Sequence, residues 1–428
     1  MQPTLGDAAS KPARRPHDRP GPTERVRIEG HIIDSLILPK VLDIILREDG
    51  SFHIAGIEIG QQREDASWAE IDVRADDDRQ LDRILRLITP HGAVPVQQQD
   101  CMLVAADIPG AFPDDFASTT NFETKVRVAG EWIPVDDIEM DCGIVVDVAA
   151  KKAVCVPMHR IRIGDMVAVG RKGIRVTPLE RDLDDPASFQ FMASAVSSEK
   201  PKGVAVRDIA TLMKQTRAEG KKILIVGGPA IIHTGGGGHL CRLIRAGYVQ
   251  VLFAGNALAT HDVEQALFRT SLGVDLEKGA PTHEGHEHHL RSINTIRRVG
   301  SLKKAIEAGV LKSGVMYECI KNGVEVLLAG SIRDDGPLPE VITDVVAAAD
   351  RMRELRAGVG FCLMIATTLH SVATGNILPA SVRVACIDIN PSTVVKLADR
   401  GTSQSVGIVS DAEPFLRVLC DELLGHSS

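Results

Sequence analysis

Residues 222–228, Lys-Ile-Leu-Ile-Val-Gly-Gly, decide the fold class of the C-terminal part of this chain. Four consecutive apolar residues that end in a glycine pair are typical of a strand buried on both faces. Similar apolar runs alternate with stretches of helical periodicity through the rest of the chain. We expect further strands at 249–253, 324–328, 361–365 and 382–389, and helices at 239–246, 339–355 and 392–400. This alternation predicts an α/β domain whose parallel sheet is covered by helices on both faces.

The chain before this sheet has a different pattern. We expect strands at 25–30, 51–59 and 69–73, and helices at 35–47 and 78–87. The order strand, helix, strand, strand, helix predicts a small α+β domain of the split β-α-β kind over residues 25–100. Residues 101–186 hold short strands and turns, which predicts a mainly β region packed on that domain. Residues 1–24 contain five prolines and indicate a disordered tail, and the parallel-sheet domain fills 187–428.

Composition excludes several classes of protein. Of 428 residues, 44% are hydrophobic and 25% are charged, which is ordinary for a globular protein. The formal net charge of −8 argues against a general binder of nucleic acid or other polyanions. Aromatic residues make up only 3%, so a stacking platform for single-stranded nucleic acid is not expected.

The cysteines favour a cytoplasmic protein, and a long uncharged stretch does not predict a membrane span. None of the eight cysteines forms a Cys-x-x-Cys motif, so we expect reduced thiols rather than disulfides or a zinc ribbon. Residues 357–382 lack Asp, Glu, Lys and Arg and are long enough to span a bilayer. They contain His370, Asn376 and Pro379, however, and therefore predict a buried strand at 359–366, a polar turn and a short helix.

Ligands of parallel sheets bind at the carboxyl ends of the strands, so the loops that follow the strands are informative. Gly227-Gly228 and the four glycines at 235–238 allow a phosphate to approach backbone N–H groups, but they are equally consistent with a flexible loop. Asn256 follows the next strand. Its side chain either faces a ligand or caps a helix that begins near His261-Asp262.

Two later strand ends carry charged residues. Arg333, Asp334 and Asp335 follow one strand, where the aspartates either form a turn or recognise ribose or amine groups while Arg333 binds a carboxylate. Asp388 ends another strand just before a helix. Dinucleotide-binding folds use such a carboxylate to hold ribose hydroxyls, and it would repel the additional phosphate of NADP. The alternative is a loop carboxylate that binds no ligand.

A histidine-rich segment, residues 283–289, does not match the zinc motif His-Glu-x-x-His. Leu290 stands where the second histidine should be if the motif began at His286, and Glu287 stands there if it began at His283. We therefore expect no metal site, and we interpret the segment as a solvated or substrate-lining loop.

Several long motifs resemble one known family. They are GHIIDSLILPKVLDII (30–45), EMDCGIVVD (139–147), GGPAIIHTGG (227–236), LFAGNALATHDVE (252–264), TSLGVDL (270–276), AGSIRDDGPLP (329–339), TTLHSVATGNILP (367–379) and CIDINPSTVVKLADRG (386–401). The chain resembles the LOR/SDH-related family that includes archaeal-type, NAD-dependent ornithine cyclodeaminases, and the resemblance extends from about residue 28 to residue 422.

The resemblance implies a fold, a cofactor and a set of contacts. The final domain is expected to be Rossmann-like, similar to the NAD-binding fold of deoxyhypusine synthase. The implied NAD contacts are Asn256, Ala257, Asp335, Thr367, Thr368, Leu369, His370, Asp388, Asp411 and Ala412. Thr368 departs from the family, where methionine is expected. Cyanobacterial relatives carry an arginine-hydrolysing module upstream, and we expect that activity to be absent here.

The implied activity is the conversion of L-ornithine to L-proline and ammonia, an ammonia-lyase reaction that uses NAD in a cytoplasmic homo-oligomer. Arg333 and Asp334 are the candidate catalytic residues by position, and Asp141 is a weaker candidate. The partner is a small amino-acid substrate, with no nucleic acid and no membrane. The alternatives are an NAD-dependent enzyme for another basic amino acid such as lysine, and a non-catalytic sensor of NAD and an amino acid.

Overall fold

The computed structural model describes residues 21–33, 35–60, 65–96, 99–177, 202–271, 274–275, 287–334, 336–399 and 405–425. The chain divides into two compact units. The first contains residues 1–118, 122–136 and 142–181, and the second contains 119–121, 137–141 and 182–428. The boundary predicted between residues 186 and 187 lies outside the described residues, as does most of the predicted N-terminal tail.

The first unit begins with a four-stranded antiparallel sheet in the order β2-β3-β1-β4. Because β3 lies between β1 and β2, the predicted split β-α-β arrangement is confirmed. Apolar residues on one face of the sheet pack against the buried faces of the two helices. The elements are β1 (Thr23–Gly30), α1 (Ile37–Arg47), β2 (Ser51–Glu58), β3 (Ser67–Arg74), α2 (Asp78–Ile88), the 3-10 helix η1 (Thr89–His91) and β4 (Val94–Pro95).

The same unit contains a second sheet, in the order β11-β6-β7-β9-β8-β10-β5. Its pairs are antiparallel except for β7 with β9. No α-helix occurs within the described residues 99–177, so the mainly β character predicted for this region is confirmed. The elements are β5 (Met102–Ala105), β6 (Glu123–Val128), β7 (Glu131–Asp136), β8 (Gly143–Asp147), β9 (Lys152–Val156), the 3-10 helix η2 (Met158–Arg160), β10 (Met166–Val169) and β11 (Ile174–Thr177).

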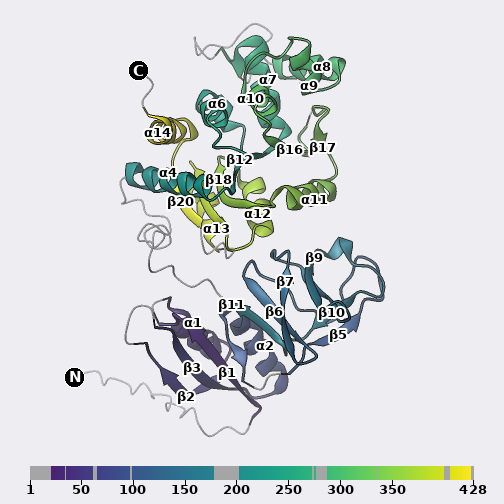
Figure 1. The fold of residues 1–428 in the computed structure, drawn as a ribbon, viewed down its shortest axis with the longest axis vertical. Coiled ribbons are helices and arrows are strands. Elements are labelled where there is room, and N and C mark those ends of the chain that lie inside the picture. Colours follow the sequence, from purple (N-terminus) through teal and green to yellow (C-terminus); the bar gives the residue numbers. More distant parts are fainter. Residues whose placement is uncertain are drawn as a thin grey trace, which may run out of the picture. The chain divides into compact units, whose positions relative to one another are not determined.

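The second unit is built on a seven-stranded sheet in the order β17-β16-β13-β12-β18-β19-β20, and every pair in it is parallel (Figure 1). The chain runs outward from β12 through β13, β16 and β17, then returns beside β12 and runs outward the other way. The strand order therefore reverses between β12 and β18. The strands are β12 (Lys222–Gly227), β13 (Val251–Gly255), β16 (Glu325–Ala329), β17 (Val341–Ile342), β18 (Val359–Ile365), β19 (Arg383–Asp388) and β20 (Ser405–Val409).

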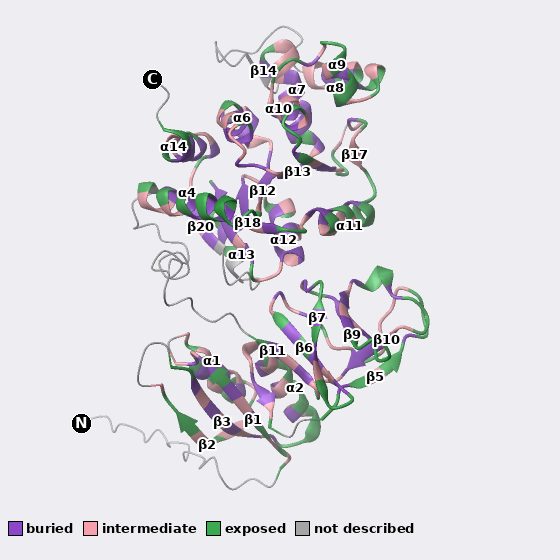
Figure 2. Ribbon diagram, viewed as in Figure 1, coloured by how far each residue is buried: buried purple, intermediate pink, exposed green. Residues whose placement is uncertain are grey.

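Both faces of this sheet are buried, as the sequence predicts. Along β12, Ile223 and Ile225 belong to one core, whereas Leu224 and Val226 belong to the other. The first core is completed by α4 (Lys202–Ala218), α5 (Ala230–His233), α6 (Gly237–Arg245), α7 (Asn256–Phe268), α8 (His288–Val299), α9 (Leu302–Glu307), α10 (Val315–Lys321) and α14 (Ala412–Leu424). The second core is completed by α11 (Val345–Leu355), α12 (Thr368–Ile377) and α13 (Pro391–Asp399). Figure 2 shows that β12 and β18 are buried along most of their length.

Two smaller features complete the second unit. A short hairpin, β14 (Thr270–Ser271) with β15 (Val274–Asp275), follows α7. The uncharged residues 357–382 form β18 and α12, which confirms the strand and helix expected there. Among the described residues, no helix is both long and apolar enough to cross a membrane.

One helix prediction is wrong at its start. The expected helix 339–355 begins only at Val345, because Val341 and Ile342 extend the parallel sheet as β17 beside β16. Asp344, two residues after the end of β17, caps the helix, since its carboxylate accepts hydrogen bonds from the backbone N–H groups of Val346 and Ala347. An acidic N-cap of this kind is a stronger start signal than the prolines upstream.

Candidate functional site

The strand-order reversal brings the loops after β12 and β18 into close contact. A Cβ atom at Gly228 would lie 1.8 Å from the carbonyl oxygen of Ala366, so only glycine fits there. The N–H of Gly228 donates to the carbonyl of Ile365 at 2.9 Å, and Ala366 has a left-handed backbone with φ of 54°. Strain of this kind is typical of functional sites. The glycine pair, for which the sequence left a phosphate site and a flexible loop open, therefore lies at the switch point, where ligands of such sheets bind.

The end of β13 supplies Asn256, which is the first residue of α7. Its Oδ1 accepts hydrogen bonds from the backbone N–H of Leu338 at 3.0 Å and from the hydroxyl of Thr260 at 3.2 Å. The alternative that Asn256 caps a helix beginning near His261 is wrong, because α7 begins at Asn256 itself and Gly255 is its N-cap. The buried side chain of Asn256 instead holds the loop after β16 against α7. Ala257 is exposed.

The loop after β16 carries the charged residues predicted to be catalytic. Asp334 accepts a hydrogen bond from the N–H of Ser331 at 2.8 Å, so its carboxylate does form a turn. Arg333 is exposed, with its N–H directed to the hydroxyl of Ser331 at 3.2 Å. Asp335 lies outside the described residues.

The first turn of α12 follows β18 and contains four of the predicted cofactor contacts. Thr367 is the N-cap residue but makes no side-chain capping bond. The hydroxyl of Thr368 lies 2.7 Å from the hydroxyl of Thr393 on α13, so this departure from the family ties two helices together. Leu369 is 77% exposed.

His370, in the same turn, lies against the end of β13. A Cβ at Gly255 would approach its Cε1 to 2.9 Å, so the ring fits only beside glycine. Burial lowers the pKa of His370, and the nearby Asp334 acts in the opposite direction. The loops after β13, β16 and β18 therefore meet around His370.

The strands on the other side of the switch point end in Asp388 and Asp411. Asp388 is buried at the end of β19, where its Oδ1 accepts a hydrogen bond from the N–H of Asn390 at 2.8 Å. Its Oδ2 accepts none from the described residues. Asp411 is exposed and caps α14 by accepting from the N–H of Ala412. The side chain of Ala412 is buried, so a ligand could reach only its backbone.

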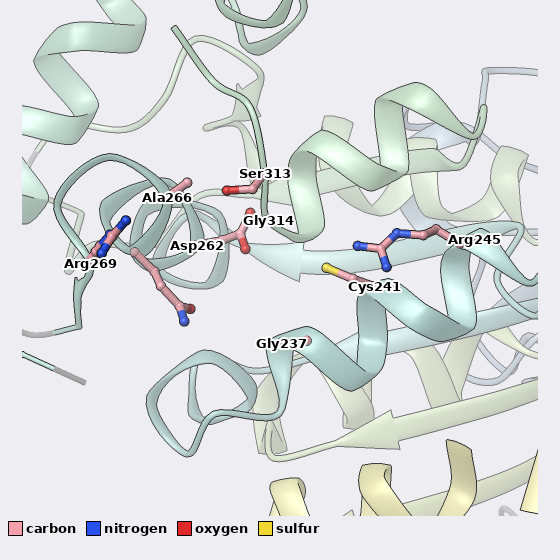
Figure 3. A pocket seen from close by; sticks show the side chains of 10 residues that line it. Gly237, Cys241, Arg245, Asp262, Ala266, Arg269, Ser313 and Gly314 are labelled. Atoms are coloured by element: carbon pink, nitrogen blue, oxygen red, sulfur yellow. The ribbon is translucent and has the colours of Figure 1, made fainter. Parts of the chain in front are cut away.

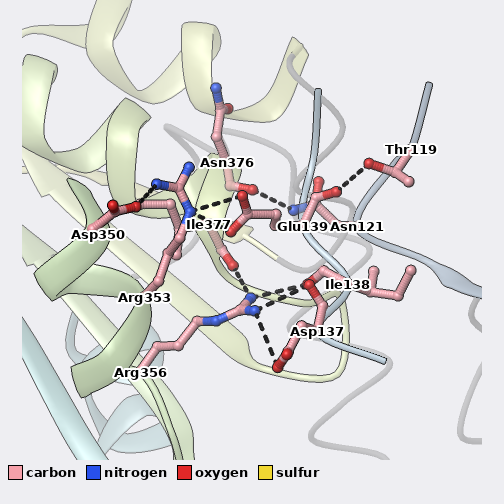
Figure 4. Close-up of polar contacts among 10 residues, drawn as sticks. All are labelled: Thr119, Asn121, Asp137, Ile138, Glu139, Asp350, Arg353, Arg356, Asn376 and Ile377. Carbon is pink, nitrogen blue, oxygen red and sulfur yellow. Dashed lines mark hydrogen bonds and ion pairs between the residues drawn. The ribbon is translucent and has the colours of Figure 1, made fainter. Parts of the chain in front are cut away.

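The far end of α12 is held by two chain segments that precede the sheet domain in sequence, 119–121 and 137–141 (Figure 4). Asn121 donates from Nδ2 to the carbonyls of Gly375, Asn376 and Leu378, the last at 2.6 Å. Arg356 donates to the carbonyl of Ile377 and, at 2.9 Å, to that of Ile138. These bonds fix the helix whose opposite end carries Thr368 to His370.

Asp141, the weaker catalytic candidate, lies in one of these segments. It has a left-handed backbone with φ of 63°, and its N–H donates to the carbonyl of Thr119 at 3.2 Å. Its neighbour Met140 donates to the carbonyl of Asn376 at 2.9 Å. These backbone contacts give the motif around Asp141 a structural role at the end of α12.

The sequence did not predict a chain of polar contacts that begins one turn into α7. His261 Nδ1 lies 2.8 Å from one carboxylate oxygen of Glu264, and the hydroxyl of Thr270 donates to the other at 3.0 Å. Thr270 in turn contacts His288 Nδ1 at 2.8 Å. The ring of His233 packs edge-on against that of His261. No group of three or more His, Cys, Asp or Glu residues in the described ranges is placed to hold a metal ion.

A cavity of about 420 Å³ is lined by residues of α6 and α7 and by Ser313 and Gly314, which precede α10 (Figure 3). Asp262 faces it, and its fully buried carboxylate accepts hydrogen bonds from the N–H groups of Val315 and Met316 at 2.7 and 2.8 Å. Burial raises the pKa of Asp262 to about 6, although the two backbone bonds act against that shift. The carboxylate therefore serves to cap α10.

Comparisons with known proteins agree with this architecture. Residues 207–419 match the model of the ArgZ-like C-terminal Rossmann fold, 123–206 match the first region of the ArgZ-like C-terminal part, and 23–122 match the conserved region of the LOR/SDH bifunctional enzyme. The ornithine cyclodeaminase of Methanothermobacter thermautotrophicus is 50% identical, over 94% of this chain and 98% of that protein.

Two solved structures extend the comparison. The apo structure of ArgZ, an arginine dihydrolase from the ornithine-ammonia cycle in cyanobacteria, is 40% identical with a TM-score of 0.83, over 94% of this chain and 58% of that one. The ternary complex of AgrE with ornithine and NAD⁺ is also 40% identical, with a TM-score of 0.51 over 94% of this chain and 57% of that one. The chain belongs to the family of the archaeal ornithine cyclodeaminases, in which a LOR/SDH conserved region precedes a Rossmann-fold domain.

Proposed function

We propose that this protein is an ornithine cyclodeaminase, an ammonia-lyase that converts L-ornithine to L-proline and ammonia with NAD as a resident cofactor. The observation that carries the proposal is the convergence of Gly228, Asn256, His370 and Asp388 at the carboxyl edge of one parallel sheet. Support comes from relatives that are named for this reaction and from a 40% identical neighbour crystallised with ornithine and NAD⁺.

The residues at this edge suit NAD in shape and chemistry. The backbone at Gly228, which has no room for a side chain, lets a pyrophosphate approach the switch point. Asp388 has one carboxylate oxygen without a partner among the described residues, which leaves it available to ribose hydroxyls. The exposed side chains of Ile332, Leu369 and Ile389 follow β16, β18 and β19 and offer apolar cover for flat rings.

Bound NAD would supply the redox chemistry, by accepting a hydride from the α-carbon of the substrate and returning it to the cyclic imine. The protein binds and orients the reactants. Arg333 is exposed beside the site and can pair with the substrate carboxylate. Asp334, next to His370, can accept hydrogen bonds from a substrate amine.

Incubation of the pure protein with NAD⁺ and ornithine, followed by amino-acid analysis, tests the proposal. Proline and ammonia should form in equal amounts without net accumulation of NADH. Lysine in place of ornithine tests the chemistry on another basic amino acid, and tight NAD binding without any turnover would instead support a sensor.

We expect a cytoplasmic homo-oligomer. The eight free cysteines are consistent with a reducing compartment, and light scattering gives the subunit number.

A further inference from the structure

The polar chain on α7 lies close to the proposed cofactor site. His261 follows Ala257 by four residues, so the two side chains share one face of the helix, a single turn apart. His233 belongs to α5, which begins directly after the switch-point loop at Gly228. Its ring centroid lies 4.5 Å from that of His261, at an interplanar angle of 63°. Two helices that start at neighbouring strand ends therefore bring their histidines together beyond the carboxyl edge.

The hydrogen bonds of Glu264 determine which nitrogen of His261 carries the proton. The carboxylate is fully buried and accepts on both oxygens, from His261 Nδ1 at 2.8 Å and from the hydroxyl of Thr270 at 3.0 Å. A carboxylate can only accept, so Nδ1 of His261 is the donor and Nε2 holds the lone pair. The hydroxyl proton of Thr270 is used by Glu264, so His288 Nδ1 must donate to that hydroxyl oxygen.

The other nitrogen of His261 is free to act on a ligand. Nε2 makes no hydrogen bond with the described residues, and it is not among their buried polar atoms that lack a partner. A histidine whose Nδ1–H is held by a buried carboxylate, with Nε2 open, is the arrangement that general bases use in catalysis.

We propose that His261 is the base that takes a proton from the side-chain ammonium group of ornithine, and that Glu264 is the residue that positions its ring. The inference rests on the ornithine cyclodeaminase function proposed above. An ammonium group has no lone pair, so the side-chain nitrogen must lose a proton before it can attack the α-carbon and close the ring.

The proton balance is simple. One N–H bond of the ammonium group breaks, its electron pair stays on nitrogen, and the proton forms an N–H bond on Nε2 of His261. The nitrogen lone pair then forms the ring C–N bond to the imine carbon, and the π electrons of that imine move to the original amino nitrogen. A proton passes from the ring nitrogen to the original amino nitrogen, whose bond to the α-carbon then breaks to release ammonia and leave the cyclic imine. The imidazolium returns its proton to water, and the released ammonia takes up a proton from water.

The titratable groups around His261 come from three helices. Burial, and to a lesser extent His261, lowers the pKa of His233 to about 4, so that ring is neutral at pH 7. His288 and His289 face the cluster from α8, and the ring of His289 lies 6.4 Å from that of His261. Glu264, on α7 itself, is the negative charge in contact with His261, at 2.8 Å from its Nδ1.

The decisive experiment compares His261→Gln with the wild type and with His53→Gln, a control on the exposed strand β2 of the other unit. We expect His261→Gln to lower kcat by roughly 10²- to 10⁴-fold, the range for loss of a general base, while NAD affinity stays unchanged. The acidic limb of the wild-type profile of kcat/KM against pH should disappear, and added imidazole should restore part of kcat. His53→Gln should match the wild type throughout.

A second measurement tests the positioning role without turnover. Nitrogen NMR spectra of the cofactor-free protein should show His261 with its proton on Nδ1, and Glu264→Gln should produce a mixture of the two tautomers. Wild-type kcat in His261→Gln would refute the inference, as would activity that is lost on chelation and restored by Zn²⁺. If the wild type itself makes no proline from ornithine, the proposed function fails instead, and the two failures are distinguishable.

Discussion

Glu139 and Arg353 form a buried ion pair although they are 214 positions apart in the chain. Nε of Arg353 donates to both carboxylate oxygens of Glu139, at 2.8 and 3.0 Å, and the Glu139 side chain is only 3% exposed (Figure 4). Arg353 also binds Asp350 on its own helix at 3.0 Å. The pair fastens the segment 137–141 to α11, beside the end of α12.

Truncation of this pair should be costly, because the mostly buried Arg353 loses the carboxylate that binds its Nε, although it keeps its bond to Asp350 on its own helix. Glu139→Ala should lower the free energy of unfolding by about 3–5 kcal/mol. Glu354→Ala is the matched control, since Glu354 forms an exposed pair with Arg351 on the same helix, and the expected cost is below about 1 kcal/mol. Denaturant unfolding of both variants measures the difference. If both variants lost the same small amount of unfolding free energy, Glu139 would not anchor the segment 137–141.

The close approach of Gly228 to Ala366 predicts that the switch point tolerates no side chain. Gly228→Ala should force the two loops apart, cost roughly 1–3 kcal/mol of stability and weaken NAD binding. Gly238 provides the control from the nearby glycine run, because a Cβ there meets nothing within 4 Å and the residue is inside α6. Gly238→Ala should raise stability by up to about 1 kcal/mol through helix propensity. Calorimetric titration measures the affinity of each variant for NAD. Wild-type NAD affinity in Gly228→Ala would refute the prediction.

Asp388 should make the site selective for NAD over NADP. Its carboxylate can accept hydrogen bonds from ribose hydroxyls and would repel a 2′-phosphate at the same position. Asp388→Ser should weaken NAD binding by ~10-fold or more, because a charge-assisted hydrogen bond is lost. The difference between the dissociation constants of NAD and NADP should also become smaller. Asp388→Asn is a useful control for folding, since its Oδ1 can still accept from the N–H of Asn390. An unchanged ratio of the two dissociation constants in Asp388→Ser would exclude this role.

The raised pKa of Asp262 predicts a pH dependence of stability. The folded protein binds this proton more tightly than the unfolded chain, since the pKa is about 6 against an ordinary 3.8. The contribution of Asp262 to stability should therefore be fully present below pH 4 and be lost as the pH rises to 6, by roughly 3 kcal/mol at about 1.4 kcal/mol per pH unit. Asp262→Asn should lack this component, whereas the exposed Asp43→Asn should retain it. Parallel unfolding curves for wild type and Asp262→Asn at all pH values would contradict the assignment.

The sequence predicted the features that depend on local pattern. The apolar run at 222–226 predicted β12, and the position of Asp388 at the end of an apolar run predicted a carboxylate at the sheet edge, because strand burial is encoded residue by residue. The split β-α-β order was likewise readable from periodicity. The start of α11 was not, because pairing of β17 with β16 depends on a neighbour that the local sequence does not specify.

Contacts between distant segments could not be predicted. The network at His261 needs Thr270 from the hairpin strand and His288 from the next helix, and no spacing rule joins them. A signal did exist within α7, where His261 and Glu264 stand three residues apart on one helical face. The sequence pattern drew attention instead to the histidine-rich segment 283–289. Residues 283–286 of that segment lie outside the described part of the chain.

The most direct test of the account is the fate of hydride during turnover of ornithine labelled with deuterium at the α-carbon. If the hydride leaves and returns within one active site, the proline should keep deuterium at its α-carbon and no NADH should accumulate. Proline without deuterium, or NADH formed in amounts equal to the ornithine consumed, would contradict internal return of the hydride and identify a different reaction.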